Sequence, residues 1–92
     1  MANEALAIGL VNKVLPLDKL IPAVTKLAMD IAKNAPLAVK STIDLVNDGM
    51  EMDLKLAYAK EQSEFSALFN SIDTSEGLSA FIEKRSPKFR GQ

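Results

Sequence analysis

One short run of strand-forming residues constrains this sequence more than any other feature. Residues 10–15, LVNKVL, predict a β-strand that ends at Pro16. A helical turn at residues 2–8, ended by Gly9, precedes this strand and is too short to be stable alone. An isolated strand leaves its backbone hydrogen-bonding groups unpaired, and the rest of the chain predicts no second strand. Residues 1–15 are therefore expected to be a remnant of something larger; the alternative is that they fold over the helices that follow.

Beyond this segment the apolar residues recur at helical spacing. Asp18 is the expected N-cap of a helix that runs to about residue 33. Pro22 then removes an interior hydrogen bond, unless it lies near the first position of the helix itself. A second helix is predicted from residues 34–36 to Gly49. The apolar stripes comprise Val24, Leu27, Ala28 and Ile31 in the first helix, and Val39, Ile43, Val46 and Met50 in the second.

Two more helices follow. Asp53 is the expected N-cap of the longest one, and Asp73 and Glu76 form a D-x-x-E start, similar to a capping box, for a short last helix. Ser86-Pro87 ends that helix, and we expect the residues that follow to form a loosely held tail. The stripe of the longest helix comprises Leu54, Tyr58, Phe65, Leu68 and Phe69, with Ile72 just beyond it.

These patterns predict a mainly α fold. A small helical domain of about four helices is expected over residues 16–85, between the helix/strand remnant at 1–15 and a basic tail at 86–92. The 48% of apolar residues and the mixed 25% of charged ones exclude a disordered chain. The longest apolar runs are far shorter than the ~20 residues that a bilayer needs, and the start lacks a signal-peptide pattern. We expect a cytoplasmic protein without a membrane partner.

The sequence contains no Cys and no His. This excludes a thiolate nucleophile, a zinc–thiolate site and a disulfide framework, and it removes the commonest general base. The remaining groups argue against a self-contained enzyme. The acidic cluster of Asp44, Asp48, Glu51 and Asp53 lacks the spacing of a calcium loop. We interpret these carboxylates as solvated helix ends and predict no metal site.

Glu61 interrupts the apolar stripe of the longest helix. A carboxylate on a core-facing side either acts as a general acid or pairs with a cation. We favour an ion pair, with Lys40 or Arg85, because no second catalytic group lies nearby in the sequence. Tyr58 is then a core or interface residue. No catalytic residue is predicted, and a small enzyme that uses Glu61 and Tyr58 is the least favoured alternative.

The positive charge is concentrated at the end of the chain. Residues 1–83 carry 7 basic and 12 acidic side chains, whereas residues 84–92 carry four basic ones. Four cations on an acidic body are a weak footprint for nucleic acid, so no such partner is predicted. This end is either a solubilising tail or a site for a phosphate or an acidic partner. Phe81 and Lys84 lie three apart on the last predicted helix, where a ring could stack a nucleobase beside an ammonium that binds its phosphate.

Several spaced groups of residues carry a family resemblance over essentially the whole chain. They are, in order, Ala5-x-x-x-Gly9-Leu10-Val11-Asn12-Lys13-Val14, Ile31-Ala32-x-Asn34-x-Pro36, Glu61-x-x-x-Phe65, and Asp73-x-x-Glu76-Gly77-x-x-Ala80-Phe81-x-Glu83-Lys84-Arg85-x-Pro87-x-Phe89-x-Gly91. With these groups the chain resembles the C-terminal third of the crotonase family, and enoyl-CoA hydratases most. The closing group, from Glu76 to Gly91, is the most specific. The single motifs are loose, but their order and spacing together are not expected by chance.

The resemblance implies that the leading turn and strand complete a larger α/β core, and that the helices pack protomers into trimers, often paired into hexamers. The family adds water reversibly across the trans-2 double bond of an acyl-CoA thioester. Two glutamates activate the water, and two backbone N–H groups stabilise the thioester enolate. These groups belong to the N-terminal portion of the family, which this sequence lacks. Glu61 matches a position in the long C-terminal helix and not a catalytic glutamate.

The resemblance also implies a few site residues. Phe81 and Lys84 match positions in the last helix that approach the adenine and 3′-phosphate of CoA, commonly of CoA bound mainly to a neighbouring protomer. Arg85 would support them through its charge. The stripe residues Leu54, Tyr58, Phe65 and Phe69 match the helical region that forms subunit contacts and lines the acyl pocket.

The first hypothesis for function is therefore the C-terminal helical part of an enoyl-CoA hydratase of fatty acid metabolism, inert by itself. Its expected partners are further copies of itself or a crotonase core, and a CoA thioester bound weakly. No resident cofactor is predicted, because acyl-CoA is the substrate of the family. The alternative is a stand-alone helical interaction module that binds a partner protein such as a full-length crotonase.

Overall fold

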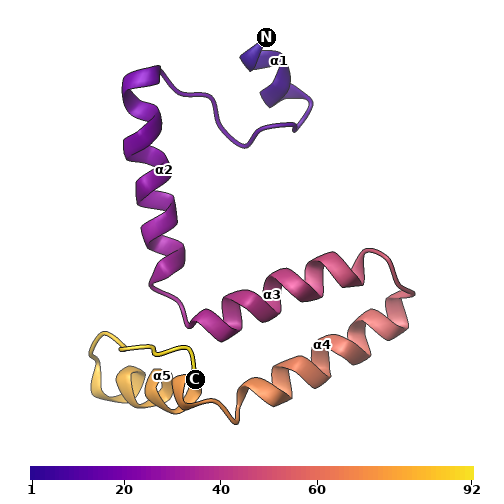
Figure 1. Cartoon of the computed structure of the whole chain (residues 1–92), viewed down its shortest axis with the longest axis vertical. Coiled ribbons are helices and arrows are strands. Elements are labelled where there is room, and N and C mark those ends of the chain that lie inside the picture. Colours follow the sequence, from indigo (N-terminus) through magenta and orange to yellow (C-terminus); the bar gives the residue numbers. More distant parts are fainter. The chain divides into compact units, whose positions relative to one another are not determined.

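The computed structural model describes residues 1–92 and contains five α-helices and no strand. The helices are α1 (Ala2–Ala7), α2 (Leu17–Ala32), α3 (Pro36–Gly49), α4 (Leu54–Leu68) and α5 (Ile72–Glu83), as Figure 1 shows. The chain divides into two compact units, Met1–Asp30 and Ile31–Gln92. The predicted mainly α fold is therefore confirmed.

The first unit lacks the strand predicted at residues 10–15. Gly9 ends α1 as predicted, with a positive φ of 75° that a glycine adopts without strain. The amide of Leu10 then donates to the carbonyl of Ala5 at 2.9 Å, which closes the end of the helix. The residues beyond it have strand-forming side chains but no neighbouring strand, so no ladder of hydrogen bonds forms.

Helix α2 begins two residues earlier than predicted. The amide of Lys19 donates to the carbonyl of Pro16 at 2.9 Å, so Asp18 lies in the first turn and is not the N-cap. Its carboxylate is still close to the positive end of the helix dipole. Pro22 lies inside the helix, where its missing N–H removes one backbone hydrogen bond near the start.

In the second unit, α3 and α4 lie side by side and are joined by a short connection (Figure 1). Pro36 occupies the first turn of α3, where its lack of an N–H costs nothing. The helix ends at Gly49 as predicted, and Gly49 lies against Ala57 of α4. The predicted N-cap of α4 is confirmed, because the carboxylate of Asp53 accepts a hydrogen bond from the amide of Lys55 at 2.9 Å.

The predicted capping box of the last helix is wrong. The N-cap of α5 is Ser71, whose hydroxyl oxygen accepts from the amide of Thr74 at 3.1 Å. The same hydroxyl donates to the carbonyl of Leu68 at 2.7 Å, which ties the start of α5 to the end of α4. The N-cap therefore lies two residues before Asp73, and Asp73 and Glu76 are left for other partners.

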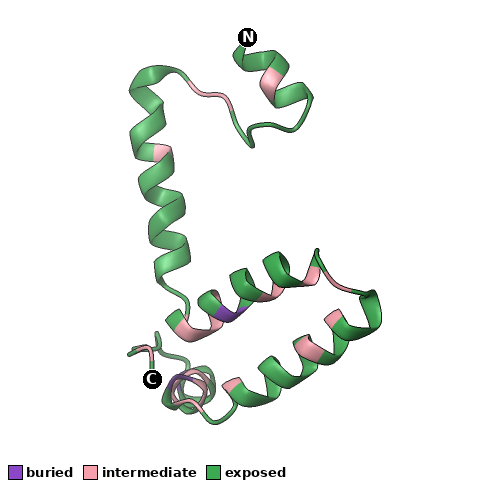
Figure 2. Ribbon diagram, turned by 45° about the vertical axis from the view of Figure 1, so that its right-hand side comes forward, coloured by how far each residue is buried: buried purple, intermediate pink, exposed green.

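Very little of the chain is buried (Figure 2). Ala80 is the only buried apolar residue, and Ser41 and Asp73 are the only buried polar ones. The predicted stripes are exposed instead: Ile43 and Val46 of α3 are 56% and 57% exposed. A helix acquires most of its stability in a protein from packing its apolar face. The apolar faces of these helices are thus formed but not covered.

Candidate functional site

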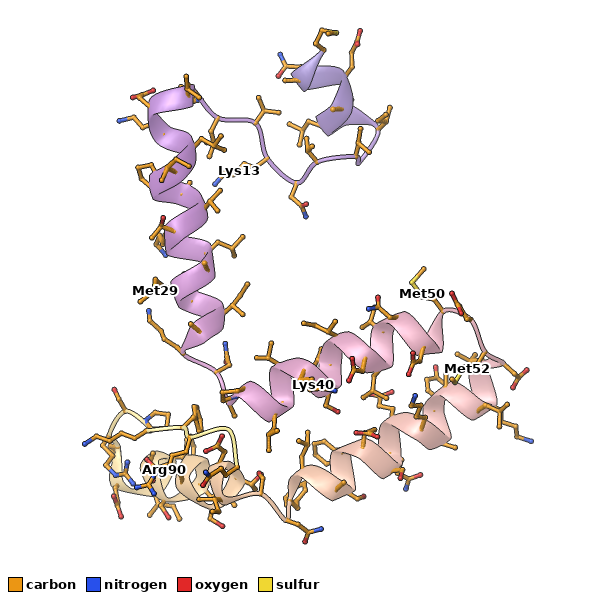
Figure 3. All side chains as sticks on the ribbon, viewed as in Figure 1. Lys13, Met29, Lys40, Met50, Met52 and Arg90 are labelled. Carbon is orange, nitrogen blue, oxygen red and sulfur yellow. The ribbon has the colours of Figure 1, made fainter.

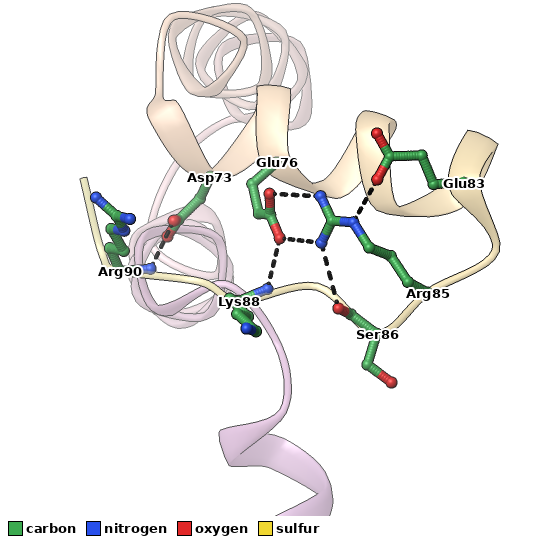
Figure 4. Close-up of polar contacts among 7 residues, drawn as sticks. All are labelled: Asp73, Glu76, Glu83, Arg85, Ser86, Lys88 and Arg90. Atoms are coloured by element: carbon green, nitrogen blue, oxygen red, sulfur yellow. Dashed lines mark hydrogen bonds and ion pairs between the residues drawn. The ribbon is translucent and has the colours of Figure 1, made fainter.

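Polar contacts are concentrated between α5 and the segment Ser86–Gln92, which we call the strap (Figure 4). Asp73 is 2% exposed, and its two carboxylate oxygens accept from the amides of Arg90 at 2.7 Å and Gly91 at 2.8 Å. Its own amide donates to the carbonyl of Gln92 at 3.1 Å. Hydrogen bonds to an ionised acceptor are stronger than neutral ones, so Asp73 fixes the end of the strap to the start of α5.

Glu76, one turn further along α5, holds the beginning of the strap (Figure 4). Its carboxylate receives two hydrogen bonds from the guanidinium of Arg85, at 2.6 and 3.0 Å, and one from the amide of Lys88 at 2.7 Å. The hydrogen bonds from Arg85, followed by the one from the Lys88 amide, lower the pKa of Glu76 from 4.5 to about 2. Glu76 is therefore ionised throughout the physiological range.

Apolar contacts complete the attachment of the strap. The ring of Phe89 lies against Gly77 of α5, where an added Cβ would be 3.5 Å from the ring. Gly91 has a φ of 73° and lies against Pro36 at the start of α3. The expectation of a loosely held tail is wrong, because two carboxylates of α5 accept from three of its backbone amides.

Lys84 makes the turn between α5 and the strap. It has a φ of 54° and is the only non-glycine residue with a positive φ. Its amide donates to the carbonyl of Phe81, and the amide of Arg85 donates to the carbonyl of Ala80 at 3.0 Å. This pairing is the Schellman ending of a helix, which usually places glycine where Lys84 stands. A lysine there costs roughly 1 kcal/mol of backbone strain.

The structure therefore does not place Phe81 and Lys84 on one face of a helix, as the sequence predicts. The helix ends at Glu83, so the three-residue helical spacing does not place the two side chains, and the left-handed turn does. Phe81 is 84% exposed, and Lys84 is also exposed. The ammonium group of Lys84 has no hydrogen bond or ion pair. A ring and a cation thus remain available at this end of α5.

Arg85 is not available in the same way. Its guanidinium pairs with Glu76 on one edge and with Glu83 at Nε. The hydrogen bonds that Arg85 donates to Glu76, and then to Glu83, raise the pKa of Arg85. The sequence predicts that Arg85 supports an anion through its charge, but in this structure the carboxylates of Glu76 and Glu83 already neutralise that charge.

The four predicted interface or pocket residues, three on α4 and Phe69 directly after it, all lie at the surface. Leu54, Tyr58, Phe65 and Phe69 are between 56% and 65% exposed. Phe65 and Phe69 form an edge-to-face pair with ring centroids 5.2 Å apart. Met50, which directly follows α3, is 83% exposed (Figure 3).

The two helices instead face one another through small and polar side chains. Ser41, buried on α3, donates to the carboxylate of Glu64 at 3.2 Å, and Lys60 pairs with Asp48. The large apolar side chains of the two stripes stay exposed beside these contacts. The long aromatic and aliphatic side chains of this pair are consequently free to pack on something else.

A hollow of about 430 Å³ lies between α3 and α4 and is lined by Tyr58 and Glu61 on the α4 side. Glu61 makes neither of its predicted ion pairs, because Lys40 pairs with Asp44 and Arg85 pairs with Glu76. No second carboxylate and no basic side chain lines this hollow. The predicted acidic cluster is also dispersed: Asp44 and Asp48 pair with lysines, and Asp53 caps α4.

Sequence reasoning missed the role of Asp73 and Glu76 in holding the strap. Their partners are mostly backbone amides 12 to 18 residues away, and a backbone amide has no signature in a sequence. The one side-chain partner, Arg85, was visible as a charge. No helix is long and apolar enough to cross a membrane.

Comparisons with known proteins find the same family over essentially the whole length of this chain. A model of the enoyl-CoA hydratase/isomerase family matches residues 1–92. The short-chain-enoyl-CoA hydratase of Clostridium acetobutylicum is 43% identical over 84 residues, which are 91% of this chain and 32% of that protein. The crotonyl-CoA hydratase of Syntrophomonas wolfei is 41% identical over 88 residues, which are 96% of this chain and 34% of that protein.

A solved structure agrees. An enoyl-CoA hydratase from Bacillus anthracis superposes with a TM-score of 0.93 at 34% identity, over 99% of this chain and 35% of that one. The chain thus spans about a third of the length of the relatives it matches.

Proposed function

Because the chain belongs to the enoyl-CoA hydratase/isomerase family, we propose that it is the C-terminal helical region of an enoyl-CoA hydratase. The parent reaction would be the reversible addition of water to a trans-2-enoyl-CoA. The observation that carries the proposal is the match of the family model to all 92 residues, while those residues span only about a third of full-length relatives. The chain would supply packing surfaces and a CoA contact, and the remainder of the parent enzyme would supply the reacting groups.

The exposed apolar stripes support a packing role. The stripe of α4 and the outward face of α3 present large side chains such as Phe65, Phe69 and Ile43 to solvent. Covering them would contribute about 25 cal/mol for each Å² of apolar surface removed from water. We propose that a crotonase core or further copies of this region cover these stripes. Residues 1–15 would then belong to the same larger core, which would offer the neighbours that they lack here.

The turn at Lys84 supports a CoA contact. An exposed aromatic ring and an exposed unpaired ammonium lie three residues apart at the end of α5. We propose that the ring of Phe81 stacks on the adenine and that Lys84 binds the 3′-phosphate. Two side chains on an open surface give only weak affinity, so binding by this chain alone would be in the millimolar range.

An amide-resolved NMR titration of the chain with CoA tests this contact, with dephospho-CoA as the control. Saturable shifts at Phe81 and Lys84 that require the 3′-phosphate are expected. No shift at millimolar CoA would mean that this chain alone has no nucleotide half-site, and the CoA part of the proposal would be abandoned.

The chain alone is expected to be catalytically inert. Glu61 lines the α3–α4 hollow without a second carboxylate or a basic group, and the resemblance assigns both catalytic glutamates to the N-terminal portion of the family, which these 92 residues do not match. Hydration of crotonyl-CoA above the buffer rate, lost on Glu61→Gln, would overturn this expectation.

A second candidate function follows from the same exposed stripes: a stand-alone module that binds a partner protein such as a full-length crotonase. An interaction module must expose apolar surface in its free state. Light scattering together with binding of an apolar dye distinguishes the cases. A clean monomer that binds no dye would count against a packing surface of either kind.

A further inference from the structure

The charged residues near the beginning of the strap differ in whether they have a partner. Of its nearby cations, only Arg85 is paired with carboxylates, and Lys84 has no partner. Glu76 contacts the chain at two points after the turn, since it binds the guanidinium of Arg85 and the amide of Lys88. Glu76 therefore fixes the positions of residues 85 and 88 relative to α5. Lys84 directly precedes Arg85, the first of these two residues.

From this geometry we infer that Glu76 and Arg85 are positioning residues that hold Lys84 in its left-handed turn beside Phe81, and that Arg85 is not itself a phosphate ligand. The inference rests on the proposed CoA contact at Phe81 and Lys84. A lysine in the left-handed region is strained by roughly 1 kcal/mol, so something must keep the turn closed. The Glu76 contacts do so from the strap side, and the Schellman hydrogen bonds do so from the helix side.

Chemistry makes Arg85 suited to this task. A guanidinium is planar and binds a carboxylate through two parallel hydrogen bonds, which fixes direction as well as distance. Both contacts to Glu76 are short, at 2.6 and 3.0 Å. A phosphate that approached Arg85 would have to displace a carboxylate already bound to it. Lys84 has no such competitor, and its single ammonium is the available cation of the turn.

The inference and simple electrostatics predict opposite changes in the affinity for CoA when Glu76 is substituted. Glu76→Gln removes a negative charge near the proposed phosphate site, which by charge alone would strengthen the binding of CoA. If Glu76 instead positions Lys84, the substitution weakens the binding of CoA, by about fivefold for the loss of one hydrogen-bonded contact. The direction of the change in Kd therefore separates the two roles.

Glu83→Gln is the matched control. Glu83 also contacts Arg85 and carries the same charge, but it binds only Nε and no part of the strap backbone. Its removal is expected to leave the affinity for CoA unchanged or slightly higher. Arg85→Lys is the second variant, since it keeps the charge and loses the two-pronged geometry. It should weaken CoA binding if Arg85 positions Lys84, and leave it unchanged if Arg85 acts by charge.

The experiment measures Kd for CoA by NMR titration in the full chain and its three variants, together with hydrogen exchange of the Lys88 amide. Weaker binding and faster exchange in Glu76→Gln, with neither change in Glu83→Gln, are expected. Binding that is equal or tighter in Glu76→Gln would overturn the inference. If the unsubstituted chain binds no CoA, the proposed CoA contact fails; unchanged exchange at Lys88 in Glu76→Gln would then show that Glu76 holds no strap either.

Discussion

The α5–strap region and the α3–α4 pair differ in whether their side chains find partners within the region. In the first region the carboxylates of Asp73 and Glu76 are matched with donors of the strap, and the ring of Phe89 is packed on Gly77. In the second the helices touch through Ser41, Lys60 and their acidic partners, while their apolar stripes face solvent.

The difference indicates which region is complete within this chain. Hydrogen-bonded contacts between residues less than twenty positions apart close a short loop, which has a modest entropic cost. Apolar stripes have no partner until another surface covers them. We conclude that the α5–strap region is held together by its own residues, whereas the α3–α4 pair exposes apolar surface, which we propose that a partner covers.

The largest effect is expected from Asp73→Asn. Asp73 is buried, and an amide can accept only one of the two strap hydrogen bonds while it presents an N–H to the other donor. The loss should be about 3 kcal/mol in the free energy of opening the strap. Hydrogen exchange at the Arg90 and Gly91 amides measures it.

Asp53→Asn is the control for this change. It is the same substitution at an exposed N-cap, where asparagine is as effective as aspartate. It should alter exchange in α4 by a few tenths of a kcal/mol at most. If Asp73→Asn has an equally small effect, the strap is not held by that carboxylate.

A smaller effect is expected from Phe65→Asp. Phe65 is 61% exposed and pairs with Phe69, so a charge there should leave α4 folded. Because an aspartate on an apolar contact face must be desolvated, self-association should weaken at least tenfold, about 1.4 kcal/mol. Sedimentation equilibrium measures it. Ser63→Asp, on the opposite side of α4, should leave association unchanged; an equal loss there would mean that added charge alone is responsible.

The third prediction concerns pH. The folded pKa of Glu76 is about 2, below its ordinary 4.5, because of the hydrogen bonds from Arg85 and the Lys88 amide. Its contribution to strap stability is therefore fully present above pH 4.5 and is lost as the pH falls towards 2. Exchange of the Lys88 amide, corrected for its intrinsic pH dependence, should accelerate over this window. Glu76→Gln should remove that acceleration; if it persists, another group controls the strap.

The smallest effect is expected from Lys84→Gly. Glycine adopts a positive φ without strain, so the strap and the end of α5 should become more stable by roughly 1 kcal/mol. The same substitution at Lys88, which has no positive φ, should not stabilise the chain. Urea unfolding followed by circular dichroism measures both. Stabilisation of equal size at the two positions would mean that removal of a charge, and not relief of strain, is the cause.

The sequence predicts the helices well because each one carries its own local signals. Asp53 caps α4, Pro36 opens α3 and Gly9 closes α1, as their residue types indicate. The errors arise where a local signal had two solutions. Ser71 and Asp73 are both good N-cap residues, and the choice of Ser71 depends on a hydrogen bond to the end of α4 that the sequence does not reveal.

The candidate site was only partly predictable, for a physical reason. Phe81, Lys84 and Arg85 were visible as an aromatic ring and cations, but their availability depends on which carboxylates reach them. The structure leaves Phe81 and Lys84 exposed and binds Arg85 to Glu76. The strand predicted at residues 10–15 is absent because a strand forms only by pairing with another, and the rest of this chain is helical.

The comparison between the two regions is tested most directly by residue-resolved hydrogen exchange of the full chain over a range of protein concentrations. The account predicts that the strap amides of Lys88, Arg90 and Gly91 are protected equally at every concentration. Amides of α3 and α4 should be weakly protected in dilute solution and gain protection as the chain associates. Equal, concentration-independent protection in both regions of a monomeric chain would contradict the proposal that a partner covers the α3–α4 surface.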